Sequence, residues 1–230
     1  MKKLLAALLL FSSAVAWAGA FEDGVAAYQK EDFKTALTKF RQLAEKADAN
    51  AQGILGVMYS NGQGVVKDHK EAVRWFLASA EKGNAASQYY LAMNYETGQG
   101  VVQNYKEAVR WYRAAAEQGH DLAQNNVGVM YAVGQGVPQD LKEAARWYRA
   151  SAEQGNADSQ ANLGAMYGQG RGVLQDNLKA HLWSNIAAAN GNVDAMKNRE
   201  IVAKKMSPQQ IEKAQQMARD CQARNYKKCD

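Results

Sequence analysis

Few residues of the 230-residue chain have the type and spacing that a catalytic site requires. The three histidines, His69, His120 and His181, occupy unrelated positions and form no metal-ligand spacing, so we expect each at the surface. The segment from Ser79 to Lys82 matches the S-x-x-K pattern of penicillin-binding enzymes, in which the serine is a nucleophile. However, the chain contains no Ser-Asp-Asn and no Lys-Thr-Gly, which would complete that site. The sequence therefore predicts no catalytic residue, no metal site and no cofactor.

The only cysteines of the chain, Cys221 and Cys229, lie close together near its end. In an oxidising compartment such a pair favours a disulfide over a metal site. A continuous helix between them would separate their Cα atoms by about 12 Å, beyond the bridging limit of about 7 Å. We therefore expect the last helix to end near residues 223–225 and the tail to fold back.

The first twenty residues have the features of a signal peptide. Lys2 and Lys3 are followed by an apolar run over 4–15 and by the small-x-small site Ala18-Gly19-Ala20. The apolar run is too short to span a bilayer, and no later segment resembles a membrane helix. The mature protein is expected to start near Phe21, without an integral membrane segment, in the periplasm or outside the cell.

Charge is distributed unevenly along the chain. Residues 197–230 contain nine Lys/Arg and four Asp/Glu, a net charge of +5, whereas residues 21–196 are nearly neutral. A basic C-terminal end can contact anionic surfaces such as lipid headgroups, although a solvated helix surface is the commoner explanation. The neutral body and the predicted export disfavour nucleic-acid binding.

An internal repeat of 36 residues dominates residues 49–192. Four units align without insertions, and each contains one of the following glutamines, tyrosines and tryptophans: Gln52, Gln88, Gln124 and Gln160; Tyr59, Tyr95, Tyr131 and Tyr167; Trp75, Trp111, Trp147 and Trp183. Each unit has two stretches with helical periodicity, separated by a Gly-x-Gly-Val loop and closed by a further glycine. The pattern predicts four pairs of helices.

Local signals place the helix ends and the core. The Gly-x-Gly-Val loop is expected to end the first helix, because glycine accepts the left-handed conformation of a C-cap. Capping boxes are predicted at the start of three second helices, in the pairs Asp68–Glu71, Asn104–Glu107 and Asp140–Glu143. A recurring small residue in the first helix, Gly56, Ala92, Gly128 or Gly164, predicts close approach of another helix. The tryptophans are interpreted as core residues rather than a ligand-stacking ladder.

Both ends of the repeat array differ from its interior. Residues 21–48 are a divergent first pair of helices, and residues 193–230 are expected to cap the other end. In the latter, Arg199 stands where the repeats have an apolar residue. A last helix is predicted to start at Ser207, with Pro208 in its first position and Gln210 completing a capping box.

The motifs Leu-Gly-x-Met-Tyr-x-x-Gly-Gln-Gly-Val and Glu-Ala-x-Arg-Trp-Tyr-x-x-Ala-Ala-Glu-Gln-Gly resemble those of the Sel-1-like repeat proteins, which are relatives of the tetratricopeptide repeats. The similarity is close over roughly residues 49–195 and looser over 21–48. It implies an all-α fold, a right-handed α-solenoid of antiparallel helix pairs, and scaffold or adaptor roles in protein complexes. Exported bacterial members are associated with envelope functions and host interaction.

The resemblance also implies that the first helices of the units line a concave face. Positions on these helices that vary between units are the candidates for contact with a protein or peptide partner, with tyrosines as rigid anchors. They are Tyr89, Tyr90, Met93, Asn94, Asn125, Asn126 and Asn162. The predicted function is that of a non-catalytic adaptor. A β-lactam- or peptidoglycan-binding envelope enzyme and a secreted factor that binds host proteins stay open as alternatives.

Overall fold

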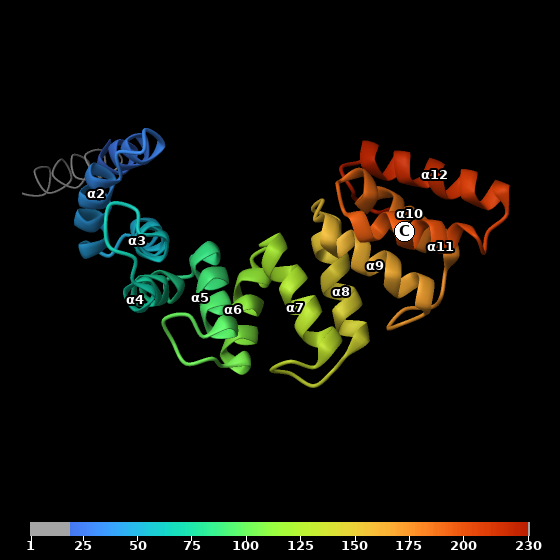
Figure 1. Cartoon of the computed structure of the whole chain (residues 1–230), viewed down its shortest axis with the longest axis horizontal. Helices are drawn as coiled ribbons and strands as arrows, with labels where there is room; N and C mark the ends of the chain where they lie inside the picture. The colour runs from blue at the N-terminus through green and yellow to red at the C-terminus, as the bar shows by residue number, and fades with distance from the viewer. Residues whose placement is uncertain (1–18, 230) are drawn as a thin grey trace, which may run out of the picture. The chain divides into compact units, whose positions relative to one another are not determined.

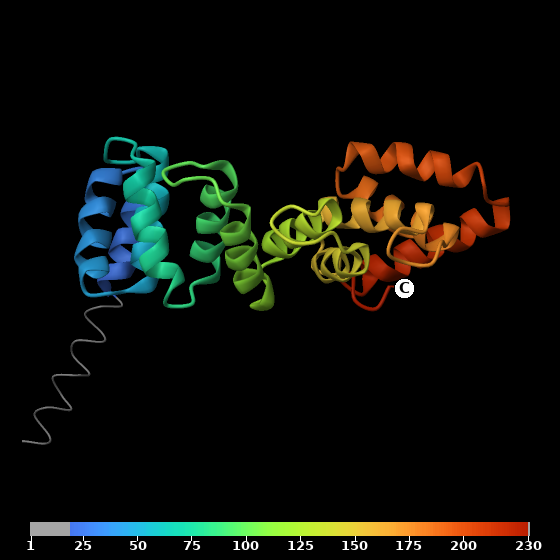
Figure 2. The same cartoon turned by 90° about the horizontal axis from the view of Figure 1, so that it is seen from below.

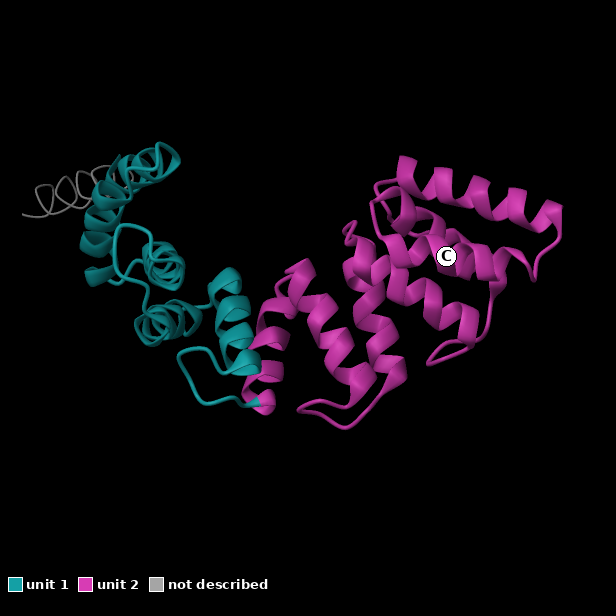
Figure 3. Cartoon of the chain, viewed as in Figure 1, with its two compact units in different colours: residues 1–104 teal, residues 105–230 magenta. Residues whose placement is uncertain are grey.

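The structure, a computed structural model, describes residues 19–229, and this part of the chain contains α-helices but no β-strand. The predicted signal peptide, residues 1–20, lies outside the described residues except for its last two. The chain divides into two compact units, of which one ends at Asn104 and the other begins at Tyr105 (Figure 3). The prediction of an all-α repeat fold is confirmed.

The described part of unit 1 begins with a helix over residues 19–29. It continues with α2 (Phe33–Glu45), α3 (Ala49–Asn61), α4 (His69–Ala80) and α5 (Ala85–Thr97). From α2 onward each helix packs against the next, and α3 also contacts α5. Phe40, Leu43, Leu55 and Met58 lie in the core of this unit, each at most 3 % exposed.

Unit 2 contains seven helices in the described part of the chain. These are α6 (Tyr105–Glu117), α7 (Asp121–Val133), α8 (Leu141–Ala152), α9 (Ala157–Gln169), α10 (Asn177–Ala189), α11 (Val193–Ala203) and α12 (Pro208–Ala223) (Figures 1 and 2). Neighbouring helices from α6 to α11 pack together, and α12 packs against α10. Its core includes Tyr148, Leu163, Trp183 and Ile186.

The first helix of every complete repeat has the same two ends. Each ends at a glycine in the left-handed region, as predicted, with φ of 74° at Gly62, Gly98 and Gly134 and 67° at Gly170. The N-caps were not predicted from the sequence, although they recur every 36 residues: Asp48, Asn84, His120, Asn156 and, at α11, Asn192. Their side chains accept a backbone N–H of the first turn, which has no partner within the helix.

Helices α4 and α8 begin as predicted in one half of the capping box only. Asp68 accepts hydrogen bonds from the backbone N–H groups of Lys70 and Glu71. The carboxylate of Glu71, which was predicted to reach back to the cap, instead pairs with Arg74 at 2.6 Å. Residues 140–146 repeat the arrangement, with an ion pair of 2.8 Å. For Glu71 and Glu143 this half of the prediction is wrong, because an arginine one turn further along the helix pairs with the glutamate. The reciprocal box at Ser207 and Gln210 is confirmed.

Small residues mark helix contacts, as predicted. A Cβ atom added at Gly56 would lie 2.5 Å from the Phe76 ring, and one added at Gly128 would lie 2.7 Å from the Tyr148 ring. The interpretation of the tryptophans as core residues is confirmed for Trp111, Trp147 and Trp183, which are at most 7 % exposed, whereas Trp75 is half-buried.

The C-terminal prediction is confirmed in its geometry. Helix α12 ends at Ala223, and the backbone then turns through Asn225 and Tyr226, both with positive φ. The turn brings the Cα atoms of Cys221 and Cys229 to 5.0 Å, and the two residues form a disulfide. The ring of Tyr226 contacts Gly155, so the tail is held against the repeats of unit 2.

Candidate functional site

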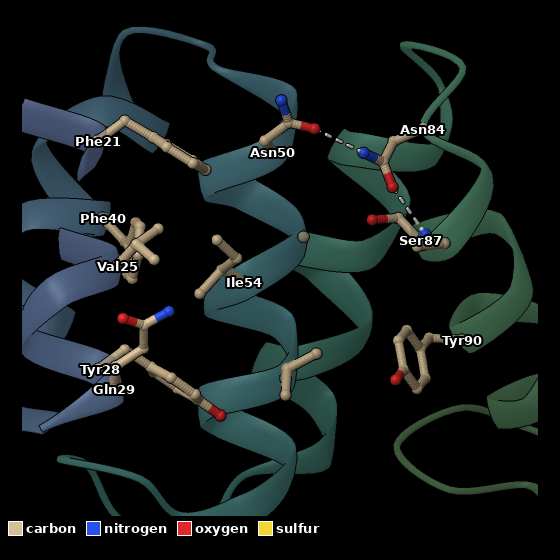
Figure 4. Close-up of a pocket in the computed structure, with 13 residues that line it drawn as sticks. Phe21, Val25, Tyr28, Gln29, Phe40, Asn50, Ile54, Asn84, Ser87 and Tyr90 are labelled. Atoms are coloured by element: carbon tan, nitrogen blue, oxygen red, sulfur yellow. Dashed lines mark hydrogen bonds between the residues drawn. The ribbon is translucent and has the colours of Figure 1, made fainter. Parts of the chain in front are cut away.

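An apolar groove with a volume of about 500 Å³ lies in unit 1 (Figure 4). We call it the unit 1 groove. It is lined by residues of the 19–29 helix, α2, α3 and the α5 region: Phe21, Val25, Tyr28, Gln29, Phe40, Asn50, Gly53, Ile54, Val57, Asn84, Ala86, Ser87 and Tyr90. The first helices of three successive helix pairs thus contribute to one surface.

The first wall comes from one face of the 19–29 helix. Phe21, Val25 and Tyr28 are spaced by four and three residues, which places them on the same side of a helix. The Phe21 ring packs edge-on against Phe40 at 5.6 Å between centroids. The Tyr28 hydroxyl donates a hydrogen bond to Oε1 of Gln63 at 2.9 Å, which fixes the position of its ring. The wall is therefore held by aromatic packing and by an anchored phenol.

The floor and the opposite wall come from α3 and α5. Gly53, Ile54 and Val57 of α3 line the floor. A Cβ atom at Gly53 would lie only 2.5 Å from Oγ of Ser87, so this glycine allows α5 to approach α3 closely. Tyr90 stacks on Phe76, with centroids 5.2 Å apart and planes 18° from parallel. The stacked ring provides a rigid, amphipathic surface on the far side of the groove.

One end of the groove is polar. The amide nitrogen of Asn84 donates to Oδ1 of Asn50 at 2.9 Å, and Oδ1 of Asn84 accepts from the backbone N–H of Ser87 (Figure 4). Every lining side chain among the described residues is uncharged. The groove is thus suited to apolar side chains, with amides at one end that can hydrogen-bond a polar group of the occupant.

The structure separates the four candidates predicted on α5. Tyr90 lines the groove, and Tyr89 packs edge-on beside it with centroids 5.5 Å apart. Met93 is 36 % exposed. Asn94 is only 4 % exposed and its amide donates to the backbone carbonyl of Tyr90 at 2.7 Å. The prediction that Asn94 lies on the binding surface is wrong, because its amide group is satisfied inside the helix instead.

The candidates in unit 2 lie half-buried on α7 and α9. Oδ1 of Asn125 accepts a hydrogen bond from the Ser159 hydroxyl at 2.8 Å, and its amide nitrogen donates to Asn126. Asn162 lines a smaller cavity of about 180 Å³ beside Tyr148. Burial raises the pKa of Tyr148 to about 12, so its hydroxyl is neutral there. The contribution of these three asparagines to binding stays a prediction.

The recurring glutamine, which carried no predicted role, joins successive helix pairs. Its amide nitrogen donates to the carbonyl of a residue near the end of the preceding helix, at 3.1–3.2 Å: Gln52 to Ala44, Gln88 to Ala80, Gln124 to Ala116, and Gln160 to Ala152. The sequence signal for this structural role was that a glutamine recurs at the same position of every repeat, with apolar residues around it. These residues connect successive helix pairs of the stack.

Ser79 is a structural residue. It is fully buried, its hydroxyl donates to the carbonyl of Ala49 at 2.6 Å, and it accepts from the Ser87 hydroxyl at 2.7 Å. Lys82 donates to Gln52 and to a backbone carbonyl, both at 2.8 Å. The S-x-x-K match therefore consists of a serine and a lysine that hold neighbouring helices together.

The histidines have different environments from those expected. The prediction of a surface position is wrong for His181, which is 2 % exposed, because its slot on α10 faces the packed helices. His120 is the N-cap of α7, where Nδ1 accepts from the backbone N–H of Ala123. Burial lowers the pKa of both side chains.

No group of three His, Cys, Asp or Glu side chains that could hold a metal occurs within residues 19–229. None of the helices in that range has the length and apolar character needed to cross a membrane.

Helix pairs with glycine-capped first helices and a 36-residue period define an α-helical repeat protein. The family model of the Sel1 repeat matches four consecutive segments, 49–84, 85–120, 121–156 and 157–192, and the chain belongs to this family. Proteins built from Sel1 repeats are in general non-catalytic scaffolds for protein–protein interaction.

Solved structures support the assignment. A Sel1 repeat protein from Oxalobacter formigenes is 35 % identical, with a TM-score of 0.73 over 76 % of this chain and 72 % of the other. A protective antigen with an SLR fold from uropathogenic Escherichia coli is 29 % identical, with a TM-score of 0.61 over 93 % of this chain and 56 % of the other. A Sel1 repeat protein from Klebsiella pneumoniae shares the fold at 20 % identity, with a TM-score of 0.52 over 83 % of this chain and 95 % of the other. Comparison with curated proteins gave no match.

Proposed function

We propose that the protein is an exported adaptor of the bacterial envelope, and that it binds a segment of a partner protein or peptide in the unit 1 groove. The observation that carries this proposal is the groove itself. It is about 500 Å³ in volume, within the range of about 300–1,000 Å³ that is typical of binding sites. Its walls are fixed by packing within unit 1, so the partner meets a surface that is already formed.

The lining defines the chemistry of the bound segment. Four aromatic rings and several aliphatic side chains line the groove, and none of the lining residues is charged, so the segment inserts apolar or aromatic side chains. Tyr28 and Tyr90 are restrained, and their binding costs little side-chain entropy. The amides of Asn50 and Asn84 offer hydrogen bonds to a peptide group at one end.

The proposed location rests on the leader. Residues 1–20 have the three parts of a signal peptide, and none of the residues that line the groove is among them. The periplasm is the proposed compartment. The second candidate function is that of a secreted protein that binds host proteins. It is retained because the similar E. coli protein is a protective antigen. The two candidates differ only in the partner.

An enzymatic alternative makes a separate prediction. If the protein hydrolysed β-lactams through the segment at Ser79, turnover of a chromogenic β-lactam would disappear in Ser79→Ala. We expect no turnover above background with the wild-type protein, because the Ser79 hydroxyl is buried and bonded to a backbone carbonyl. Serine-dependent turnover would contradict the adaptor proposal.

The adaptor proposal is tested by site-specific photo-crosslinking in living cells. A photoreactive amino acid is placed at Ile54, on the groove floor, and in a second variant at Val66, which is 85 % exposed in a loop of the same unit. We expect a discrete crosslinked protein from position 54 that is absent from position 66 and is lost when Tyr90→Ala is added. Equal crosslinking from both positions, or none from position 54, would contradict the groove as the binding site.

A further inference from the structure

Helix α11 is a first helix without the second helix of its own unit. It starts at Val193, 36 residues after α9, and has the recurring N-cap at Asn192. In the complete repeats the first helix packs against the second, as α9 does against α10 through Gly164. The residue of α11 that corresponds to Gly164 is Glu200, which is exposed. No Gly-x-Gly-Val loop follows α11, and the next helix, α12, packs against α10.

Without a second helix packed against it, α11 has an exposed face that combines apolar and charged side chains. Ala195 and Val202 lie on the opposite side and are buried. The exposed side has residues spaced by three and four positions: Val193, Met196, Lys197, Glu200, Ile201 and Lys204. Val193, Met196 and Ile201 are 64 %, 42 % and 54 % exposed, although in the preceding repeat the position of Met196 is the fully buried Gln160. Terminal repeats of such arrays normally end in a polar face, so apolar exposure here points to a partner.

We propose that this face binds the same face of a second copy of the chain, with the two α11 helices antiparallel about a two-fold axis. The argument is the order of charges. In an antiparallel pair centred between residues 198 and 199, Lys197 lies level with Glu200 of the partner subunit, and the reciprocal pair forms by symmetry. Lys197 otherwise has only an exposed pair with Asp194 at 3.6 Å. Met196 and Ile201 flank the charges on either side and supply the apolar contact.

The expected dimer is weak. One exposed face of an 11-residue helix per subunit falls below the standard interface size, which corresponds to transient association. Dimer formation therefore depends on protein concentration and, because ion pairs lie at its centre, on ionic strength. The surface is separate from the unit 1 groove, so dimerisation and partner binding can be tested independently.

The experiment is analytical ultracentrifugation of the protein without residues 1–20, from micromolar to millimolar concentration at low salt. We expect a monomer–dimer equilibrium in the wild type. Lys197→Glu and Glu200→Lys should each weaken the Kd about tenfold or more, because each introduces two like-charge contacts per dimer. The double variant K197E/E200K should restore wild-type association, since the pairs form with reversed signs. Lys213→Glu on α12 is the matched control for a single charge reversal.

A wild-type protein that is monomeric throughout this range would overturn the proposal. So would a dimer that is insensitive to both single variants, or a double variant that stays as weak as the singles. Circular dichroism of each variant shows that the fold is retained, because all the substituted side chains are exposed.

Discussion

Single residues at helix contacts determine how closely the helices of this protein pack. Gly128 faces the Tyr148 ring, so an alanine at 128 places a methyl group 2.7 Å from a ring carbon in a filled core. Gly168, on α9 of the same unit, has only ordinary contacts at 3.5 Å and beyond. The same substitution thus meets two environments.

We expect Gly128→Ala to lower the free energy of unfolding by about 1–3 kcal/mol, as is typical of overpacked cores. Gly168→Ala should be neutral or stabilising by up to about 1 kcal/mol, because alanine favours the helix. Urea unfolding of the two variants measures the difference. Equal changes in the free energy of unfolding would show that the core around Tyr148 can rearrange to accommodate the added methyl group.

Buried His181 and half-buried His120 predict how stability depends on pH. Burial is the first cause of the lowered pKa of His181, with Arg199 of α11 as the second, and burial also lowers the pKa of His120. The unfolded chain, with a histidine pKa of about 6.5, then binds protons that the folded chain does not. The contribution of these two histidines to stability is therefore complete above about pH 6.5, and it is lost as the pH drops toward their lowered folded-state pKa values.

The matched test is the double variant His120→Asn/His181→Gln, because asparagine is the cap at the corresponding positions 84 and 156. Urea unfolding at pH 7.5 and 5.5 should show a smaller loss of stability in the variant than in the wild type. An identical loss would mean that other groups cause the pH dependence.

At the scale of helices, the sequence predicts what depends on local rules. The glycine C-caps, Pro208 at the start of α12 and the end of α12 before the disulfide all follow from backbone preferences of a few adjacent residues. Predictions failed where a side chain had a choice of partner. Glu71 pairs with Arg74, and the Asn94 side chain donates a hydrogen bond to the backbone of its own helix. A sequence pattern does not show which of several possible partners within one helical turn a side chain will bind.

The candidate site was predicted in part. Tyr90 was identified because it varies between repeats on the correct helix. The first wall, formed by Phe21 and Val25, was not, because residues 21–48 diverge from the repeat and have no frame to align to. The surface position predicted for His181 was wrong because it was inferred from the polarity of the side chain alone, whereas the packing of the helices buries this residue.

The disulfide is predicted to stabilise the last element of unit 2. It closes a short loop, with a sequence separation of 8, and holds Tyr226 against Gly155 and near Asn190. Chain-entropy reasoning for a loop of this size gives about 2–3 kcal/mol as an upper estimate. We expect Cys229→Ser to lower the free energy of unfolding by up to this amount and to increase amide hydrogen exchange over residues 222–229. The double variant C221S/C229S should behave alike. Unchanged exchange would show that packing of Tyr226 alone holds the tail.

At the scale of the molecule, each helix contacts mainly its neighbours along the chain. The groove in unit 1 therefore depends on a different set of helices from the disulfide-closed tail and the α11 face, which both rest on α10, and a change at the groove is expected to leave these two intact. This independence suits an adaptor, in which several surfaces are used at once.

The same property makes a repeat removable. Residues 121–156 form one complete unit inside unit 2, and their deletion would join α6 to α9 in the correct frame. The buried face of α6, with Ala108, Trp111 and Tyr112, matches that of α8, with Ala144, Trp147 and Tyr148, so α9 would meet an equivalent surface. The recurring glutamine bond would also be conserved, since Gln160 would find Ala116 in place of Ala152.

We therefore expect the variant lacking 121–156 to keep the mean residue ellipticity of the wild type at 222 nm within about 10 % and to unfold cooperatively, because nearest-neighbour interfaces are restored. Deletion of residues 139–174 removes the same number of residues but joins the loop after α7 to the loop after α9, so it tests whether the position of the junction matters. It preserves the 36-residue register too and should behave alike, whereas deletion of residues 121–150 breaks the register and should lose helix and cooperativity. A collapse of helicity in the two in-register deletions would mean that stability depends on contacts beyond adjacent helices, and the repeat description would then be insufficient.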